Sequence, residues 1–160
     1  MNPHRPISPS AALMRLEELC SRSEQCTSEA MSKLSSWGIA HDIADKIIIR
    51  LKSRRFIDDG RYARAFARDK VVYNRWGRVK VRRALTLKRI DPETIDEAMS
   101  EVDDEEYRSA LIEVIRAKGR VLKPPFDFGK KQKILRHAAS RGFEPSLIIE
   151  VIKHPELWTS

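Results

Sequence analysis

The sequence predicts an all-α protein made of three tandem modules of three helices each. We expect these modules to form an elongated, curved array of helices packed at about right angles, with no sheet. Three observations predict this fold class. Apolar residues recur at intervals of three and four positions along most of the chain. The alternation typical of strands is almost absent, and a pattern of apolar residues repeats with offsets of 51 and 53 positions.

The first module is expected at residues 9–55, after a flexible tail at residues 1–8 that shows no periodicity. Its first helix begins near Pro9, because proline tolerates the first turn of a helix. The second ends before Gly38, which suits the left-handed residue that follows many helices. The third covers residues 41–54, where apolar side chains share one face. The residues expected to cap the first two helices are Ser8 or Ser10 and Thr27 or Ser28.

The second module is expected at residues 56–102. Asp58 or Asp59 caps its first helix, since a carboxylate there accepts unpaired backbone N–H groups and suits the helix dipole. Gly77 breaks this helix, and the next one covers residues 78–89. Asp91-Pro92 begins the last helix as N-cap and first-turn proline. Residues predicted to form the apolar faces of the first two helices are Tyr62, Ala65, Phe66, Asp69, Val72, Tyr73, Trp76, Val81, Ala84, Leu85 and Leu87.

The third module is expected at residues 103–160. A helix from Asp103 to Lys118 has acids in its first turn and bases in its last, which matches the helix dipole, and Gly119 ends it. Residues 120–127, with Pro124-Pro125, form an irregular loop. Two further helices follow, the first at residues 128–141 and the second from Glu144-Pro145 to His154-Pro155.

The repeat emerges when Gly38, Arg89 and Gly142 are aligned. A module of about 50 residues buries little surface by itself, so we expect neighbouring modules to pack on one another. The module boundaries lack Gly/Pro linkers, which favours a continuous array over separate domains. The aligned sets are Ala30, Val81 and Ile134; Leu34, Leu85 and Ala138; Ile43, Thr94 and Leu147; Ala44, Ile95 and Ile148; Ile47, Ala98 and Val151; and Ile48, Met99 and Ile152.

The net charge of +8 is unevenly distributed. Residues 50–89 contain fifteen lysines and arginines against three aspartates, a local net charge of +12. The remainder has 16 basic and 20 acidic residues, and residues 91–110 contain nine acids with Arg108 as the only base. A basic middle followed by an acidic segment is suited to steering towards a polyanion or an acidic partner.

Motifs for catalysis or cofactor binding are absent from the sequence. There is no glycine-rich phosphate loop, no nucleophile motif and no cluster of metal ligands, so we expect no catalytic residue, no metal and no cofactor. Asp58-Asp59 can be interpreted as paired carboxylates for acid–base chemistry, but helix capping is the favoured interpretation. Five residues separate Cys20 from Cys26, which fits no common zinc or redox spacing. The sequence therefore predicts a protein that is not an enzyme.

The cationic surface of the middle module has two interpretations, a solvated helix face or a binding surface. An excess of one charge sign is self-repulsive, and arginine outnumbers lysine eleven to four over residues 50–89. The planar guanidinium suits bidentate contacts with carboxylates and phosphates, which favours binding. Tyr73 and Trp76 could stack on bases, but their spacing favours a place in the core. The candidate partner- or DNA-binding residues are Arg61, Arg64, Arg68, Lys70, Arg75, Arg78, Lys80, Arg82 and Arg83.

One stretch of the middle module resembles the RecX family, regulators of the bacterial RecA recombinase. Residues 56–63 read Phe-Ile-Asp-Asp-Gly-Arg-Tyr-Ala, and Phe66, Lys70, Gly77 and residues 85–90, Leu-Thr-Leu-Lys-Arg-Ile, follow. About ten positions over 35 residues match the pattern of that family. The helical repeat, the Pro-Pro break and the final module extend the resemblance over most of the chain.

Two positions depart from the family pattern. Gly60 stands where glutamate or alanine is usual, which loosens the first helical turn by up to about 1 kcal/mol. Arg89 stands where glycine is frequent, so the turn there must accept a side chain or stay right-handed. Neither departure removes a named binding residue.

The resemblance implies a function that composition alone does not. Proteins similar to this one bind the RecA–DNA filament, lie along its groove, inhibit its ATPase and strand exchange, and have no catalytic residues. The partners expected from it are therefore the RecA filament and single- or double-stranded DNA, and we expect the chain to be a monomer. Two alternatives stay open: a small helical DNA-binding protein acting independently of RecA, and a purely structural adaptor.

A membrane partner is not expected. No apolar run approaches the roughly 18–20 residues that a membrane helix needs. The N-terminal residues also lack the apolar segment of a secretory signal. The sequence therefore predicts a cytoplasmic protein.

Overall fold

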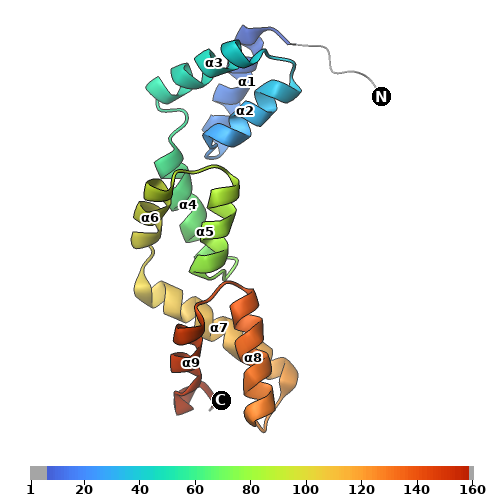
Figure 1. Cartoon of the computed structure of the whole chain (residues 1–160), viewed down its shortest axis with the longest axis vertical. Coiled ribbons are helices and arrows are strands. Elements are labelled where there is room, and N and C mark those ends of the chain that lie inside the picture. The colour runs from blue at the N-terminus through green and yellow to red at the C-terminus, as the bar shows by residue number, and fades with distance from the viewer. Residues whose placement is uncertain (1–6, 159–160) are drawn as a thin grey trace, which may run out of the picture.

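The computed structural model describes residues 7–158 and confirms an all-α fold (Figure 1). Within this range there are nine α-helices and a final 3-10 helix, and no strand. Residues 1–6 of the predicted tail, like residues 159–160, lie outside the described residues. The elements are α1 (Pro9–Arg22), α2 (Thr27–Ser36), α3 (His41–Ser53), α4 (Asp59–Val72), α5 (Arg78–Leu87), α6 (Pro92–Ser100), α7 (Asp104–Leu122), α8 (Phe128–Ser140), α9 (Pro145–Ile152) and η1 (Pro155–Trp158).

The helices follow one another in three groups along the longest axis of the molecule (Figure 1). In the first group, α1 and α2 both pack against α3, while α4, α5 and α6 pack on one another in the second. In the third group, α8 packs against both α7 and α9, and α7 also contacts α4. This arrangement supports the predicted modules at residues 9–55, 56–102 and 103–160, whose boundaries stay a prediction.

The buried side chains form two cores rather than three. The first core lies in α1 to α3 and extends to Ile57. The second runs without a break from Tyr62 in α4 to Leu157 in η1. Cys26, which precedes α2, is fully buried in the second core although α2 itself belongs to the first. The second and third helix groups therefore share one core, and the first group joins them through a smaller set of contacts.

The predicted repeat is present in the backbone. Gly38, Arg89 and Gly142 all adopt a left-handed conformation, with φ of 79°, 59° and 97°. In each case the N–H of the next residue donates to the carbonyl five positions earlier, at 3.0 to 3.3 Å. Arg89 thus takes a conformation that costs a residue with a Cβ atom about 1 kcal/mol. Four of the six aligned apolar sets are buried in all three groups.

Side-chain caps begin four of the helices. Ser8 accepts a hydrogen bond from the N–H of Ala11, and Asp58 accepts one from the N–H of Arg61, as predicted. The bond from Arg61 is the main cause that holds the pKa of Asp58 below its usual value. Asp103 and Asp127 cap α7 and α8 in the same way.

Two predictions about the first helix group need revision. The residue that caps α2 is Cys26, which makes no side-chain cap bond, and not Thr27 or Ser28. The predicted tail ends before Ile7, because the N–H of Ile7 donates to the carbonyl of Trp37 at 3.3 Å. Ile7 also packs against the first core, so it belongs to the first helix group.

The predicted apolar faces of α4 and α5 were partly wrong. α4 ends at Val72, well before Gly77, and Arg75 adopts a left-handed backbone with φ of 53°. Tyr73 consequently lies beyond the helix and its surface is 78% exposed. Leu87, the last residue of α5, is 79% exposed. The buried residues of α4, besides Tyr62, are Ala63, Ala67 and Val71.

Gly119 does not end α7, contrary to the prediction. The helix continues to Leu122, and Gly119 is buried within it. A Cβ atom at this position would lie 3.4 Å from the ring of Phe126 and 3.9 Å from that of Trp158. Glycine therefore serves here to let two aromatic rings approach the helix. The irregular segment after α7 is shorter than predicted and begins at Lys123.

Candidate partner interface

The nine predicted binding residues lie on α4, on α5 and on the link between them. The structure brings them into three settings. Some contact acids of the next helices, some hold the helix groups together, and some lie over aromatic rings. The three settings differ in how far the basic side chains remain accessible to a partner.

The outer side of α4 carries two arginines that face acids. Arg64 lies 3.6 Å from Glu101, and Arg68 lies 3.8 Å from Glu106. These four groups line a groove of about 470 Å³ between α4 and the α6–α7 link. The Arg68 side chain is 71% exposed, so its pair is worth little and can exchange for an outside carboxylate or phosphate. The exposed Arg75 lines an adjoining groove beside Glu105 and other acids of α7.

Arg61 contributes to the contact between the first and second helix groups. Its Nε atom donates to Glu24 at 2.5 Å, and its terminal nitrogen donates to the carbonyls of Arg55 and Phe56 at 3.0 and 3.3 Å. The hydrogen bond to Glu24 is the main cause that raises the pKa of Arg61. Its guanidinium is therefore engaged inside the chain.

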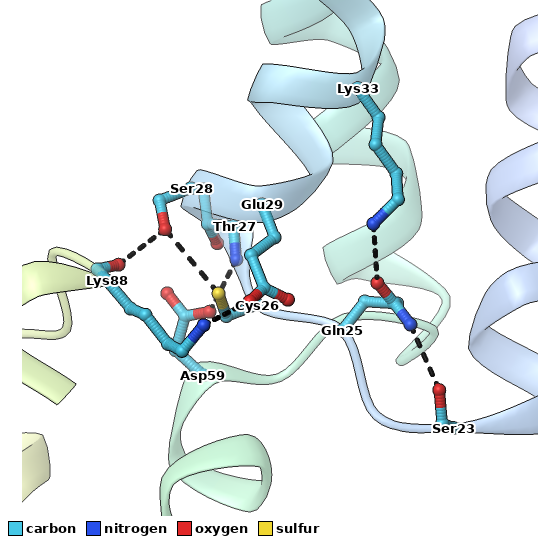
Figure 2. A network of polar contacts seen from close by, with 9 residues as sticks. All are labelled: Ser23, Gln25, Cys26, Thr27, Ser28, Glu29, Lys33, Asp59 and Lys88. Atoms are coloured by element: carbon cyan, nitrogen blue, oxygen red, sulfur yellow. Dashed lines mark hydrogen bonds and ion pairs between the residues drawn. The ribbon is translucent and has the colours of Figure 1, made fainter. Parts of the chain in front are cut away.

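Figure 2 shows the polar network that surrounds this contact. Asp59 accepts a hydrogen bond from the N–H of Thr27 at 2.8 Å, so a residue of α4 supplies the cap that α2 lacks. Ser28 donates to the backbone carbonyl of Lys88 at 2.5 Å, and the Lys88 ammonium pairs with Glu29. We call this network, together with the Arg61–Glu24 pair, the first joint. The neighbouring acids Asp58 and Asp59 thus begin two different helices.

Arg78 has the corresponding place between the second and third helix groups. Its guanidinium pairs with Asp104 at 3.0 Å and with Glu144 at 3.6 Å, and lies 3.8 Å from the centre of the Tyr107 ring. The Tyr107 hydroxyl accepts from the backbone N–H of Arg78 at 3.0 Å and donates to Glu144 at 2.7 Å. Burial is the main cause that raises the pKa of this hydroxyl.

Gly77 and Gly142 allow the backbones of the second and third helix groups to come into direct contact. The N–H of Gly77 donates to the carbonyl of Arg141 at 2.8 Å, and the N–H of Val79 donates to the carbonyl of Gly142 at 3.0 Å. A Cβ atom on Gly77 would lie only 2.0 Å from the carbonyl carbon of Gly142. We call these contacts, with the Arg78–Tyr107–Glu144 cluster, the second joint.

Lys70 and Lys80 lie over the ring of Trp76, with Nζ atoms 4.9 and 4.5 Å from the ring centre. Trp76 also meets Phe66 edge to face, so it is a half-buried anchor as predicted rather than a free stacking platform. Arg82 pairs with Asp96 at 2.6 Å. Arg83 is exposed at the rim of a groove of about 390 Å³ beside Trp76 and Lys80.

Sequence reasoning missed the apolar part of this groove. Val79 and Leu87 line it and are 48% and 79% exposed, so α5 presents apolar residues flanked by cations on its outer side. Leu87 is the last residue of α5, two positions beyond the buried Leu85. Such a mixed surface suits a partner that offers both apolar and acidic groups.

The described residues of this surface are mainly cations and apolar side chains. Between residues 7 and 158 there is no group of three histidines, cysteines or acids that could hold a metal. In the same range, no helix combines the length and apolarity needed to cross a lipid bilayer. The arrangement can therefore bind an anionic surface, and its arginines are spaced to contact several carboxylates or phosphates together.

A family model described as RecX, second three-helix domain, matches residues 58–99. Three curated proteins with similar sequences are each named regulatory protein RecX. The one from Clostridium acetobutylicum is 32% identical over 129 residues, which cover 78% of this chain and 59% of the relative. The one from Clostridioides difficile is 31% identical and covers 84% and 63%, and the one from Neisseria meningitidis is 28% identical and covers 88% of both. The chain thus spans about three fifths of the length of the clostridial relatives.

Two solved structures have the same fold. A crystal structure of regulatory protein RecX superposes with a TM-score of 0.81 over 91% of this chain and 72% of the other, at 20% identity. The structure of RecX from Lactobacillus salivarius gives a TM-score of 0.80 over 93% and 97%, also at 20% identity. These likenesses confirm the helical architecture over nearly all of the chain.

Proposed function

Because this chain belongs to the RecX family of regulatory proteins, we propose that it regulates a RecA recombinase by binding the RecA–DNA filament. The chain lies along the filament groove and suppresses ATP hydrolysis and strand exchange. It does so without chemistry of its own, by occupying a surface. The resulting role is in the control of DNA recombination and repair.

The observation that carries this proposal is the linear order of three helix groups held by two specific joints (Figure 1). A filament presents the same surface at regular intervals, so a ligand that bridges subunits needs contact points at a fixed separation. In a chain with flexible linkers, ordering the linkers on binding would cost entropy and would weaken the bridged complex. Bridging neighbouring subunits opposes the movements that ATP turnover and disassembly require.

The cations of α4 and α5 are the proposed contact. Arg64, Arg68 and Arg82 face the chain's own acids through ion pairs that are at least partly exposed, so outside acids can replace them at small cost. Arg75 and Arg83 are exposed. Arg61 and Arg78, whose guanidinium groups are engaged at the joints, contribute by holding the shape.

The test is RecA ATPase inhibition by a variant with Arg64→Glu and Arg68→Glu. Reversing both charges should raise the concentration needed for half-inhibition by about tenfold, because like charges then face the filament. The matched control is Arg64→Lys with Arg68→Lys, which keeps the charge and should lose less. If the charge-reversed variant inhibited the RecA ATPase as strongly as the wild type, the proposed contact would be wrong.

An independent DNA-binding function would give a different pattern. Affinity for bare DNA would then follow salt with a log–log slope of about −0.9 per phosphate contacted, and inhibition would require enough protein to coat the DNA. Inhibition at concentrations well below those that coat the DNA supports the filament proposal. Inhibition that merely tracks DNA coverage contradicts it.

A further inference from the structure

A second basic region lies in the third helix group, outside the middle module. Residues 116–141 contain nine lysines and arginines and a single acid, Asp127. That acid caps α8, where it accepts a hydrogen bond from the N–H of Lys130 at 2.9 Å. Within residues 7–158, the ion pairs involve no cation of this segment. Five of the six arginines of α4 and α5 pair with the chain's own acids in this range, whereas the cations of residues 116–141 do not.

Lys131 of α8 lies over the ring of Trp158, 5.7 Å from its centre. The other basic side chains of α8, together with Arg141 just after its end, gather on one side of the helix. With 3.6 residues per turn, they occupy an arc of about 140° beside the buried stripe of Ile134 and Ala138. Lys133 lies in the middle of this arc and Arg136, one turn further on, lies at its edge, and both are exposed. From its first to its last member the arc extends about 16 Å along the chain. The members are Lys130, Lys133, Arg136, His137 and Arg141, and we call this set the α8 track.

Neighbouring elements extend the positive charge of the track. Lys118 of α7 and Arg141 lie near enough to His137 that, after burial, their charges lower the pKa of its imidazole. The Arg141 guanidinium donates to the carbonyls of Asn74 and Arg75 in the α4–α5 link. The track therefore leads from the far end of α8 towards the exposed Tyr73, whose ring is free to stack.

Unbalanced charge on one face is unfavourable for the isolated protein, because like charges repel. A bound polyanion relieves this repulsion, and the nucleic acid releases counterions as it binds. The second effect drives nucleic-acid binding by basic surfaces. The spacing also fits, because cations on successive turns can follow phosphates along a strand. A protein partner that offers apolar and acidic groups fits α5 better, because exposed apolar side chains lie beside cations there. The members of the α8 track are all polar.

We propose that the α8 track binds the phosphate backbone of single-stranded DNA, while the α4–α5 surface binds protein. This inference rests on the proposed function for its choice of DNA among polyanions. It assigns the two charged regions of the chain to two different partners. Lys133 and Arg136 contact phosphates directly, and Tyr73 stacks on a base at one end of the track.

The experiment measures binding of the full chain to a fluorescent oligothymidylate, without RecA, over a range of salt concentrations. In the variant with Lys133→Gln and Arg136→Gln, the log–log salt slope should fall in magnitude by about 1.4, since each single-strand contact contributes about 0.7. At 0.1 M salt the same two contacts correspond to an affinity loss of about 25-fold. The matched control, Lys46→Gln with Arg50→Gln, removes the same charge from exposed positions on α3. It should change affinity by less than about threefold, because charges beyond about 10 Å are screened.

A second readout is the pKa of His137, followed by NMR. Bound phosphates stabilise the imidazolium against Lys118 and Arg141, so the pKa should rise when the oligonucleotide is added. Equal losses in the α8 variant and its control would overturn the inference, because total charge would then explain binding. Unchanged DNA affinity in the α8 variant, even with weaker binding to the RecA filament, would overturn it too. Because the assay contains no RecA, it remains decisive if RecA inhibition itself is not observed.

Discussion

The two joints of this molecule connect similar helix groups by different physical means. The first joint consists of side-chain hydrogen bonds and ion pairs, among them the bond between Asp59 and Thr27 (Figure 2) and the pair of Arg61 and Glu24. It also separates two apolar cores. The second joint joins backbones at Gly77 and Gly142 and lies beside one continuous core. The first joint should respond to salt more strongly than the second, because exposed charges are screened, whereas the second joint adds packed backbone contacts to the ion pairs of Arg78.

The largest expected effect is on the second joint, with Gly77→Ala. Its Cβ atom would lie 2.0 Å from a backbone carbon of Gly142 and 2.1 Å from the N–H nitrogen of Phe143, so the two groups must separate. We expect a loss of about 3 kcal/mol or more in the free energy of unfolding, measured by urea denaturation.

The control for this variant is Gly60→Ala on α4. There the nearest atoms are side-chain atoms of Asp58 and Arg64 at 3.2 and 3.3 Å, which can move. Alanine also favours the helix by up to about 1 kcal/mol, so Gly60→Ala should be neutral or stabilising. If Gly77→Ala were as stable as Gly60→Ala, the backbone contact would not hold the second joint.

A smaller effect is expected at the first joint with Asp59→Ala. The substitution removes the only side-chain partner found for the N–H of Thr27 in the described part of the chain, at the start of α2. Loss of a helix cap costs about 1 kcal/mol, and up to about 2. Hydrogen exchange should show faster opening in α2 than in α8. Uniform acceleration across both helices would contradict a local role for Asp59.

The smallest effect is the coupling between Arg61 and Glu24, whose side chains are 38% and 31% exposed. A double-mutant cycle with Arg61→Gln and Glu24→Gln should give about 0.5–1 kcal/mol at low salt. It should fall towards zero in 1 M salt, where the screening length is about 3 Å. The Glu18–Arg22 pair within α1 is the control for helix effects. A coupling that persists in high salt would mean that the first joint is not electrostatic.

Local patterns were enough to predict the helices and the repeat. Ser8 and Asp58 act on N–H groups three residues ahead, and the left-handed turns at Gly38 and Gly142 close bonds within one helix end. The cap of α2 could not be predicted, because Asp59 lies 32 positions from Thr27. Gly119 was misinterpreted since glycine ends helices and also permits close packing, and only the fold distinguishes these roles.

The candidate interface was predictable to a lesser degree. Two of the candidate residues, Arg64 and Arg68, lie together on one side of α4 and line the same groove. Helical spacing could not reveal that Arg61 and Arg78 engage Glu24 and Glu144, because those partners come from other helix groups. The basic segment at residues 116–141 was overlooked because its charge was summed with the acids of residues 91–110.

Because Cys26 is buried in the second core, the reactivity of its thiol reports how often the first joint opens. This thiol is fully shielded, while Cys20 on α1 is partly accessible. A thiol reagent can reach Cys26 only when the first helix group lifts away, so its alkylation rate relative to that of a free thiol measures how often the joint opens. Neither an added label nor a substitution is needed, and the same rate can be followed while a partner is bound.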